Sequence, residues 1–294
     1  MKILITGCHG QLGNELISIL SSGKSEIGPM PSALENAEIC AVDIDTLDIS
    51  DVTAVKSLVA AEKCDVIINC AAMTNVDGCE SDYETAFKVN AMGVRNLAMA
   101  AKSVDAKLIH VSTDYVFAGD GVRPYVEWDK VDPQSAYGAS KALGEKYALE
   151  FNDKTFVVRT SWLYGYVGKN FVKTVRRILK EKGGMTVVND QRGNPTNAND
   201  LAHHLLKLAL TEEYGIYHCT GEGECTWFDF AKKIAELSGY DGDIVKPCTS
   251  DEFPSPTKRP AFSSLRNLAL QCTVGNEMRD WETAIENYIK NLED

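Results

Sequence analysis

"KILITGCHGQLG", residues 2–13, combines a short apolar run with three closely spaced glycines. Residues 2–6 are typical of a buried strand, and the residues after the last glycine carry apolar side chains at helical spacing. Gly7 allows a tight turn, Gly10 lets the backbone approach a pyrophosphate, and Gly13 lets the helix pack close to the strand. The stretch therefore predicts a dinucleotide site at a helix N-terminus, the alternative being a glycine-rich turn without a ligand.

The same alternation of strand and helix continues from this turn through the first 160 residues. We expect further strands at 38–44, 65–72, 106–112 and 155–163, and helices at 11–22, 51–62, 83–104 and 133–151. The strands are near-continuous Val/Ile runs, which is typical of a parallel sheet covered by helices on both faces. The pattern predicts an α/β fold with a Rossmann-type doubly wound parallel sheet.

The pattern changes beyond residue 160. We expect a basic helix at 170–181, a strand at 185–190, a helix at 198–210, a strand at 215–219 and a helix at 226–239. The last fifty residues are rich in Pro and Ser around "DEFPSPTKRPAF". We therefore expect an NAD(P)-binding domain at 1–160, to which segments near 190–220 return. A smaller, mainly substrate-binding lobe is expected at 161–294.

Composition narrows the class of protein. The 294 residues are 44% hydrophobic and 24% charged, with no apolar run long enough to span a membrane and no signal peptide. Nine scattered cysteines without C-x-x-C spacing favour reduced thiols in the cytoplasm and argue against a zinc site. A net charge of −12 argues against nucleic-acid binding. We expect a cytoplasmic protein, monomeric or homodimeric, with a small-molecule partner and no membrane partner.

Acidic residues follow the second expected strand. Asp43 ends that strand, where an acid commonly hydrogen-bonds the 2′-hydroxyl of the adenosine ribose. Such a contact favours NADH over NADPH, because the carboxylate repels a 2′-phosphate. The alternative is an acid that only starts the next loop. Asp48 and Ile49, slightly later, are expected to border the adenine.

Polar side chains end the fourth strand in "HVSTDYVF", residues 110–117. The next helix carries Tyr137 and Lys141 four residues apart, hence on one face. A carbonyl that receives a hydride needs a proton donor, and a tyrosine keeps its proton at neutral pH. An ammonium about 4 Å away would lower the tyrosine pKa by about three units, and Thr113 is placed to hydrogen-bond the same oxygen. The arrangement predicts a reaction site rather than a loop start.

The order of these motifs resembles the short-chain dehydrogenase/reductase superfamily, in its extended sugar-nucleotide branch. Sugar-nucleotide 4,6-dehydratases of that branch carry Thr-Asp-Glu after the fourth strand, and this chain has Tyr115 in place of the Glu. Without that carboxylate, water elimination lacks its general base. The resemblance therefore implies a simple ketone reduction.

The whole chain resembles the dTDP-4-dehydrorhamnose reductase family. The stretches that carry the likeness are "GCHGQLGNEL", "DVIINCAAMTNVDGCE", "STDYVFAGDG", "AYGASKALGE", "RTSWLYG", "NDQRGNPT" and "PTKRPAFSSL". The resemblance implies reduction of the C4 ketone of dTDP-4-dehydro-L-rhamnose to dTDP-L-rhamnose with NADPH or NADH. This is the final step of dTDP-rhamnose biosynthesis, which serves cell-wall polysaccharide. Mg²⁺ is implied by the resemblance alone, and the sequence identifies no ligands for it.

The resemblance also assigns site residues. The pyrophosphate is assigned to Gly10, Gln11 and Leu12, the adenosine half to Asp43, Asp48 and Ile49, and the rest of the cofactor to Ala71, Ala72 and Met73. The substrate is assigned to Thr113, Asp114 and Trp162, with Tyr137 as the acid and Lys141 on the nicotinamide ribose. For the diphosphate of the substrate, Arg259 is a candidate, as is the helical stripe Lys169, Lys173, Arg176 and Lys180. The alternatives are a solvated stripe, and for Trp162 a buried aromatic at a strand end.

Other functions remain open on the sequence. The nearest is the same reduction on another 4-keto-6-deoxy nucleotide sugar. A non-catalytic NAD(P)-binding regulatory subunit is a second, disfavoured because Thr113, Tyr137 and Lys141 are all present. An epimerase is a third, distinguished by NAD that stays bound during purification.

Overall fold

The computed structural model describes residues 1–253 and 255–292, and its centre is a six-stranded parallel sheet. The strands, in spatial order, are β12 (Gly215–His218), β7 (Thr155–Thr160), β6 (Lys107–Thr113), β5 (Val66–Asn69), β1 (Lys2–Thr6) and β4 (Glu38–Val42). The predicted Rossmann-type doubly wound sheet is confirmed. The strand order reverses between β1 and β5, so the carboxyl ends of these two strands border a crevice suited to a ligand.

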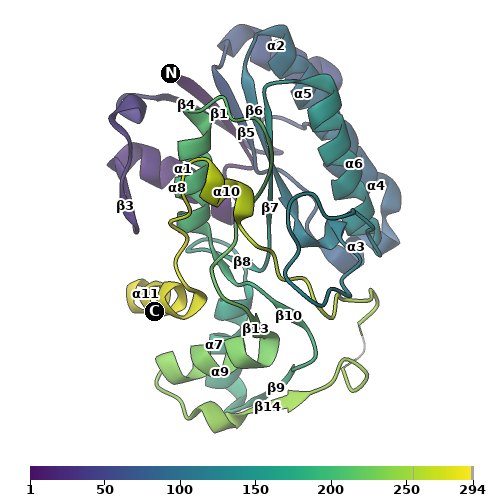
Figure 1. The fold of residues 1–294 in the computed structure, drawn as a ribbon, viewed down its shortest axis with the longest axis vertical. Coiled ribbons are helices and arrows are strands. Elements are labelled where there is room, and N and C mark those ends of the chain that lie inside the picture. Colours follow the sequence, from purple (N-terminus) through teal and green to yellow (C-terminus); the bar gives the residue numbers. More distant parts are fainter. Residues whose placement is uncertain (254, 293–294) are drawn as a thin grey trace.

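Helices cover both faces of the sheet, as Figure 1 shows. One face carries α1 (Gln11–Ser22) and α8 (Ala198–Ala209). The other carries α2 (Val52–Glu62), α5 (Val94–Ser103) and α6 (Ala136–Phe151). Since each face buries its own set of side chains, the strands are apolar on both sides.

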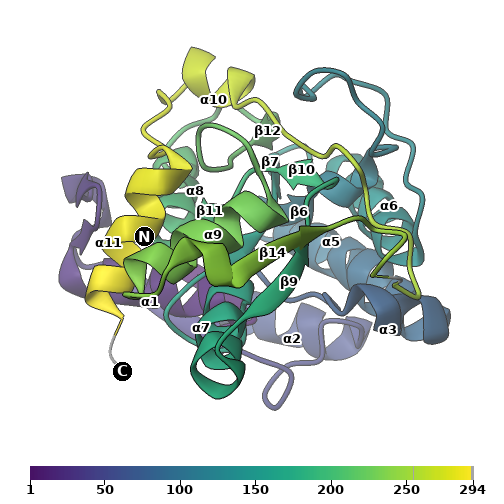
Figure 2. The same ribbon diagram turned by 90° about the horizontal axis from the view of Figure 1, so that it is seen from below.

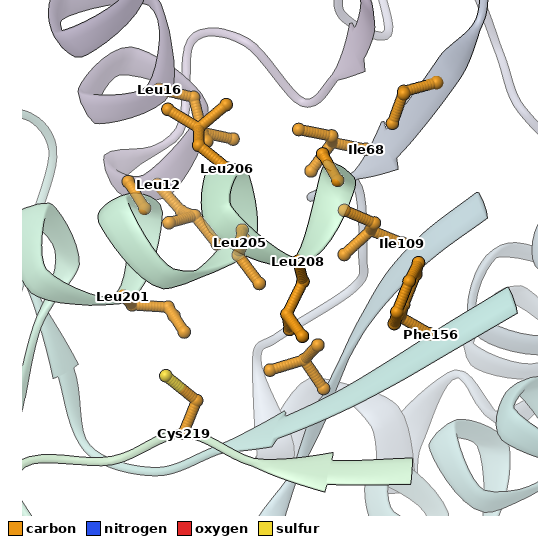
Figure 3. Close-up of a cluster of buried hydrophobic side chains, with 14 of the residues drawn as sticks. Leu12, Leu16, Ile68, Ile109, Phe156, Leu201, Leu205, Leu206, Leu208 and Cys219 are labelled. Atoms are coloured by element: carbon orange, nitrogen blue, oxygen red, sulfur yellow. The ribbon is translucent and has the colours of Figure 1, made fainter. Parts of the chain in front are cut away.

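The core between the sheet and the α1/α8 face is shown in Figure 3. Leu12 and Leu16 of α1 face Leu205 and Leu206 of α8, and strand residues such as Phe156 lie opposite. All of these side chains are at most 4% exposed. Helix α8 lies at residues 198–209, well after the first five strands of the sheet in the sequence. The sheet domain is therefore completed by a segment that is distant in sequence from the N-terminal part of the domain.

A smaller lobe lies beyond the carboxyl ends of the strands, and Figure 2 views the molecule from this side. Its core joins α7 (Phe171–Lys182), α9 (Trp227–Leu237) and α11 (Trp281–Asn291). A parallel pair, β9 (Met185–Val188) with β14 (Val245–Cys248), borders it. Two short pairs connect lobe and sheet: β8 (Leu163–Tyr164) with β11 (Thr196–Asn197), and β10 (Arg192–Gly193) with β13 (Cys225–Thr226).

The long helix expected at 83–104 is present from Tyr83 to Ser103, and it contains a π-helical turn. The chain forms α3 (Val76–Ser81), α4 (Tyr83–Phe87), a π-helical turn at Lys88–Gly93, and then α5. The carbonyl oxygen of Asn90 in this turn would lie 2.2 Å from a Cβ at Gly144 of α6, so the π-turn packs directly on the α6 backbone. The expected long helix is therefore present, and its π-bulge at this close helix contact is the feature that a periodicity of 3.6 does not reveal.

The strand expected at 155–163 ends at Thr160, because Trp162 has a φ of +47° and turns the chain away. Several short elements lie where the sequence indicated none. They are β2 (Lys24–Ser25), β3 (Gly28–Pro29), η1 (Ser32–Leu34), η3 (Asp114–Val116), η4 (Gly242–Ile244), β14, α10 (Leu268–Cys272) and α11. Within the described residues, no helix is long and apolar enough to cross a membrane.

Candidate active site

A cleft of about 840 Å³ opens at the carboxyl ends of the strands, at the point between β1 and β5 where the strand order reverses. It brings together the site residues predicted from the sequence except Arg259 and three members of the basic stripe, Lys173, Arg176 and Lys180. The lining includes Gly7, Gly10, Gln11, Leu12, Gly13, Asp43, Asp48, Ile49, Ala71, Ala72, Met73, Thr113, Asp114, Tyr137, Lys141 and Trp162. Residues from both the sheet domain and the lobe thus share one cavity, of the size that small-molecule sites commonly have.

The glycine turn has a different requirement at each of its three positions. Gly7 has a φ of +67°, and a Cβ there would lie 2.8 Å from the backbone nitrogen of Ala71. A Cβ on Gly13 would lie 2.3 Å from the carbonyl oxygen of Gly7. A Cβ on Gly10 meets only that same oxygen, at 3.2 Å. The first and third glycines are therefore needed for the turn itself, while the second leaves space on the cleft side.

The N-terminus of α1 suits an anion. Its N-cap, Gly10, offers no side-chain hydrogen bond, and the first turn of the helix contains no acidic residue. The free N–H groups and the positive end of the helix dipole are thus available to an anion without competition from a side chain. The side chain of Gln11 has another task, since its Oε1 accepts hydrogen bonds from the N–H of Gly165 (2.8 Å) and the amide of Asn170 (3.0 Å).

The end of β4 places Asp43 beside the glycine turn. Its two carboxylate oxygens accept hydrogen bonds from the N–H groups of His9 (2.9 Å) and Ile44 (2.8 Å). Among the described residues, Cys8, His9 and Asp43 form one group whose donor atoms lie within 4.8 Å of one another. Sulfur and imidazole donors suit transition metals rather than Mg²⁺, which prefers oxygen ligands. The Mg²⁺ implied by the resemblance stays a prediction.

Thr113 lies at the end of β6 and organises the turn that follows. Its hydroxyl donates to the carboxylate of Asp114 (2.9 Å) and accepts from the N–H of Tyr115 (3.2 Å). The same hydroxyl hydrogen-bonds Tyr137. Burial raises the pKa of Asp114 to about 6, and hydrogen bonds with Ser263 and Thr113 oppose this. The four polar residues after the strand are thus packed into the cleft wall.

Tyr137 and Lys141 project from the first turns of α6, which begins at the N-cap Ser135. The Lys141 ammonium donates a 2.6 Å hydrogen bond to the carbonyl oxygen of Val111. Burial raises the pKa of Tyr137, with the Thr113 hydrogen bond acting in the opposite direction. Burial also lowers the pKa of Lys141 to about 8, against the attraction of nearby acidic groups. The pKa of Tyr137 is therefore raised in this structure rather than lowered as expected, because desolvation is the largest effect on its hydroxyl.

Trp162 lies at the lobe side of the cleft. Its ring stacks on Trp227, with centroids 3.6 Å apart and planes at 10°. A Cβ on Gly193 would lie 2.7 Å from the ring of Trp162, so the glycine of "QRGNPT" makes room for the indole. Both tryptophans line the cleft. Trp227 was missed from the sequence, where its position directly after the N-cap Thr226 marks only a helix start.

Arg259 is not among the residues that line the cleft. Its guanidinium donates to the carboxylate of Asp77 (2.9 Å) and to the hydroxyl of Tyr115 (3.4 Å). Tyr115 in turn packs edge-on against Tyr137, with ring centroids 5.5 Å apart. Arg259 therefore contacts Tyr115 of the cleft wall without lining the cleft itself.

The predicted basic stripe is divided between two hollows. Lys169 lines the cleft. Lys173, Arg176 and Lys180 line a separate hollow between α7 and the end of α11. The ammonium of Lys173 donates to the carbonyl oxygen of Tyr166 at 2.6 Å. Only the first member of the stripe is thus placed to meet a ligand in the cleft.

Asn90 is a second residue that the sequence did not reveal. Its side-chain oxygen accepts from the N–H of Met73 (2.8 Å), and its amide donates to the carbonyl of Met73 (3.0 Å) and to Ser140 (3.1 Å). The residue clamps the chain after β5 to α6, and it is 1% exposed. No local pattern marks it, because the clamp depends on the π-helical turn.

Comparison with known proteins identifies the family. The model of the RmlD substrate binding domain matches residues 1–294. The chain belongs to this family. The chain is 38% identical to the dTDP-4-dehydrorhamnose reductase of Aggregatibacter actinomycetemcomitans, a relative, over 97% of each chain. The resemblance to dTDP-4-dehydrorhamnose reductases is thereby confirmed.

Solved structures of dTDP-4-dehydrorhamnose reductases superpose closely on this RmlD-family chain. A dTDP-4-dehydrorhamnose reductase of Clostridium acetobutylicum is 46% identical, covers 99% of each chain and has a TM-score of 0.92. The Bacillus anthracis enzyme of the same name, in complex with NADP, is 39% identical over 98% of each chain with a TM-score of 0.91. The likeness extends over both the sheet domain and the lobe.

Proposed function

We propose that the chain is an NAD(P)H-dependent reductase that converts the C4 ketone of dTDP-4-dehydro-L-rhamnose to the alcohol of dTDP-L-rhamnose. One observation carries the proposal: Thr113, Tyr137 and Lys141 meet in the same cleft that begins at the glycine turn. The names of the relatives over the full chain length supply the substrate class.

The cofactor fits the glycine-turn side of the cleft. The N–H groups that begin α1 take the diphosphate, and Lys141 takes the nicotinamide ribose. The chain after β5, at Ala71–Met73, forms the wall between these two contacts. A bound nicotinamide supplies the hydride that is transferred to C4 of the sugar.

Tyr137 supplies the proton that balances the hydride. Because burial raises its pKa, the hydroxyl is protonated at neutral pH and can donate to the oxygen at C4. The Thr113 hydroxyl stabilises the phenolate that remains when it turns its proton from the Asp114 carboxylate to the phenol oxygen. The Lys141 ammonium adds positive charge to the same site, so that it favours proton release. The C4 carbonyl thereby gains one hydride and one proton and becomes a secondary alcohol.

The lobe is proposed to bind the nucleotide sugar, with residues 161–294 as the substrate-binding part and 1–160 as the cofactor domain. Trp162 and Trp227 present a stacked aromatic pair at the cleft, and Lys169 adds a cation. Asp114 lines the cleft beside Thr113, where a carboxylate can accept from a sugar hydroxyl. Arg259 joins this set only if it leaves Asp77, and it is proposed as a substrate contact on that condition.

Elimination of water is disfavoured at this site. Tyr115 occupies the position where a dehydratase would carry a carboxylate, and its hydroxyl lies 3.4 Å from the Arg259 guanidinium. A phenol whose pKa is raised by burial does not act as a general base at neutral pH. Reduction of another 4-keto-6-deoxy nucleotide sugar is the second candidate, because the same relay serves any such ketone.

The deciding experiment is an absorbance assay of NADH and NADPH oxidation with enzymatically prepared dTDP-4-dehydro-L-rhamnose. Wild type should oxidise at least one of the two rapidly, and Tyr137→Phe should not, while it still binds the cofactor. Activity of Tyr137→Phe within a few-fold of wild type would remove the tyrosine from the mechanism. Turnover only with a different 4-keto sugar would favour the second candidate, and cofactor binding without any turnover would favour a regulatory subunit.

A further inference from the structure

Arg159 is a fully buried arginine in the middle of the sheet. It lies on β7 at 1% exposure, in register with Ser112 of β6 on one side and His218 of β12 on the other. A buried guanidinium is costly unless its charge and its N–H donors are matched. The residue does not line the cleft, so the mechanism above gives it no role.

Its partner is Glu145 of α6, which is also buried. The Arg159 guanidinium donates to both carboxylate oxygens of Glu145, at 2.9 and 2.7 Å, and the Ser112 hydroxyl donates to one of them at 2.6 Å. A further guanidinium donor reaches the carbonyl oxygen of Glu127 at 3.2 Å. The cation also lies 5.0 Å from the centre of the Phe117 ring. The carboxylate thus joins one helix to two strands.

The position of this cluster relative to the reaction site is specific. Tyr137, Lys141 and Glu145 are spaced by four residues on α6 and therefore share one face of the helix. Ser112 directly precedes Thr113 on β6. The cluster consequently ties the helix that carries the proton donor to the strand that carries its hydrogen-bond partner.

We infer that Ser112, Glu145 and Arg159 are positioning residues: they hold Tyr137 and Lys141 in place against Thr113, and they put the negative charge of Glu145 beside the Lys141 ammonium. The inference deepens the proposed reductase function and rests on it. Glu145 and Arg159 act through Lys141, because neither of them lines the cleft.

The other groups around Lys141 leave Glu145 as the source of negative charge. The titratable groups around this lysine are Cys70 after β5, His110 on β6, Tyr137 and Glu145 on α6, and Arg159 on β7. Burial raises the pKa of Cys70 to about 12 and lowers that of His110 well below its usual value, so both are uncharged at neutral pH. Glu145 therefore offsets the desolvation that lowers the lysine pKa to about 8.

This arrangement has a pH consequence with a definite sign. The ammonium of Lys141 is present below its pKa and is lost as the pH rises through about 8. Removal of the Glu145 charge lowers that pKa further, because both desolvation and the unpaired Arg159 disfavour a second cation. The alkaline limit of cofactor binding and of turnover should then move to lower pH.

The test compares Glu145→Gln with Glu145→Asp. NADPH affinity, followed by fluorescence, and kcat/KM are measured between about pH 6 and 10. Glu145→Gln should move the alkaline limit down by about one pH unit, whereas Glu145→Asp, which keeps the charge, should leave the limit near wild type and lower only kcat. Identical alkaline limits for wild type and both variants would overturn the electrostatic part of the inference.

Ser112→Ala provides a second test, which also serves if Glu145→Gln does not fold. The matched control is Thr155→Val, because the Thr155 hydroxyl donates to carbonyls of Ala148 and Asn152 and ties the far end of the same helix to β7. At comparable thermal stability, Ser112→Ala should lower kcat about tenfold and Thr155→Val should not. Equal kcat values for the two variants would overturn the positioning role.

The proposed reductase function and the role of Glu145 can be tested separately. If wild type oxidises neither NADH nor NADPH with any nucleotide sugar, the proposed function fails. The pH dependence of NADPH affinity in wild type and Glu145→Gln still decides the role of Glu145, because it needs no turnover.

Discussion

The two ends of the cleft are assembled from different kinds of sequence. At the glycine-turn end, defined by Gly7, Gly10 and Gly13, the lining residues belong to one short segment that runs from a strand through a turn into a helix. At the tryptophan end, defined by Trp162 and Trp227, two rings from distant segments stack on each other. The first end is a local motif whose geometry is required by backbone contacts, and the second exists only when the lobe is folded. The comparison suggests that changes at the first end act on cofactor and stability, and changes at the second on the sugar nucleotide.

Lys141→Met should have the largest effect, since Lys141 lies between the two ends and serves both. Loss of the ammonium removes the proposed ribose contact and the charge beside Tyr137, so turnover should fall by about 10²–10⁴-fold and NADPH affinity should fall with it. Initial rates and fluorescence titration measure the two effects. The matched control is Lys173→Met, because the Lys173 side chain lines the separate hollow and its ammonium donates to the backbone carbonyls of Tyr166 and Gly168. Unchanged affinity in Lys141→Met would contradict the ribose contact.

Gly13→Ala and Gly10→Ala should separate stability from binding within the glycine-turn end. A Cβ at Gly13 lies 2.3 Å from the backbone oxygen of Gly7, so the helix must shift, and the free energy of unfolding should fall by about 1–3 kcal/mol. Gly10→Ala meets only one contact at 3.2 Å. It should keep most of the stability and still lose NADPH affinity. Denaturant unfolding and titration together check the pair, and equal stability losses would contradict the distinction.

Trp162→Ala should act on the sugar nucleotide alone. Without the indole, the stack with Trp227 at the tryptophan end is lost, and KM for the sugar nucleotide should rise about tenfold. NADPH affinity should stay at the wild-type value. Trp162→Phe, which keeps an aromatic ring, should recover most of the loss. A fall in NADPH affinity equal to the rise in KM would show that the two ends are not separable.

Asp43→Ala should produce the smallest change. If Asp43 meets the adenosine ribose, its removal should raise the kcat/KM ratio of NADPH over NADH by a few-fold to about tenfold, because the repulsion of a 2′-phosphate is lost. The two carboxylate oxygens also hold the N–H groups of His9 and Ile44, so Asp43→Asn is the control that removes the charge and keeps one acceptor oxygen for these contacts. An unchanged ratio in both variants would remove Asp43 from the cofactor site.

The same contrast explains what the sequence could predict. The glycine turn and the pair Tyr137–Lys141 were recognisable because their geometry depends on spacing along a strand–turn–helix or along one helix. The near-continuous apolar strands likewise predicted the parallel sheet. Trp227 and Asn90 were missed because their neighbours in space are distant in sequence.

Two further features depend on contacts and burial in the folded chain, which sequence patterns do not show. The helix expected at 83–104 contains a π-bulge where the Asn90 carbonyl packs on Gly144, and the sequence of neither helix alone indicates this contact. The pKa of Tyr137 depends on how completely the folded chain excludes water, and burial is the largest effect on it. Arg259 was identified as a cation near the site, but its pairing with Asp77 across the fold could not be read from the chain.

The return of the chain to the sheet limits how this protein can be taken apart. The edge strand β12 and the covering helix α8 both belong to the sheet domain, yet they lie between segments that build the lobe. A cut at residue 160 would therefore yield two fragments, each with an exposed apolar face and neither a complete module. The lobe is not one transplantable unit but several insertions joined by sheet-domain segments. New specificity in such an architecture is more easily obtained by exchanging single loops than by exchanging the lobe as a block.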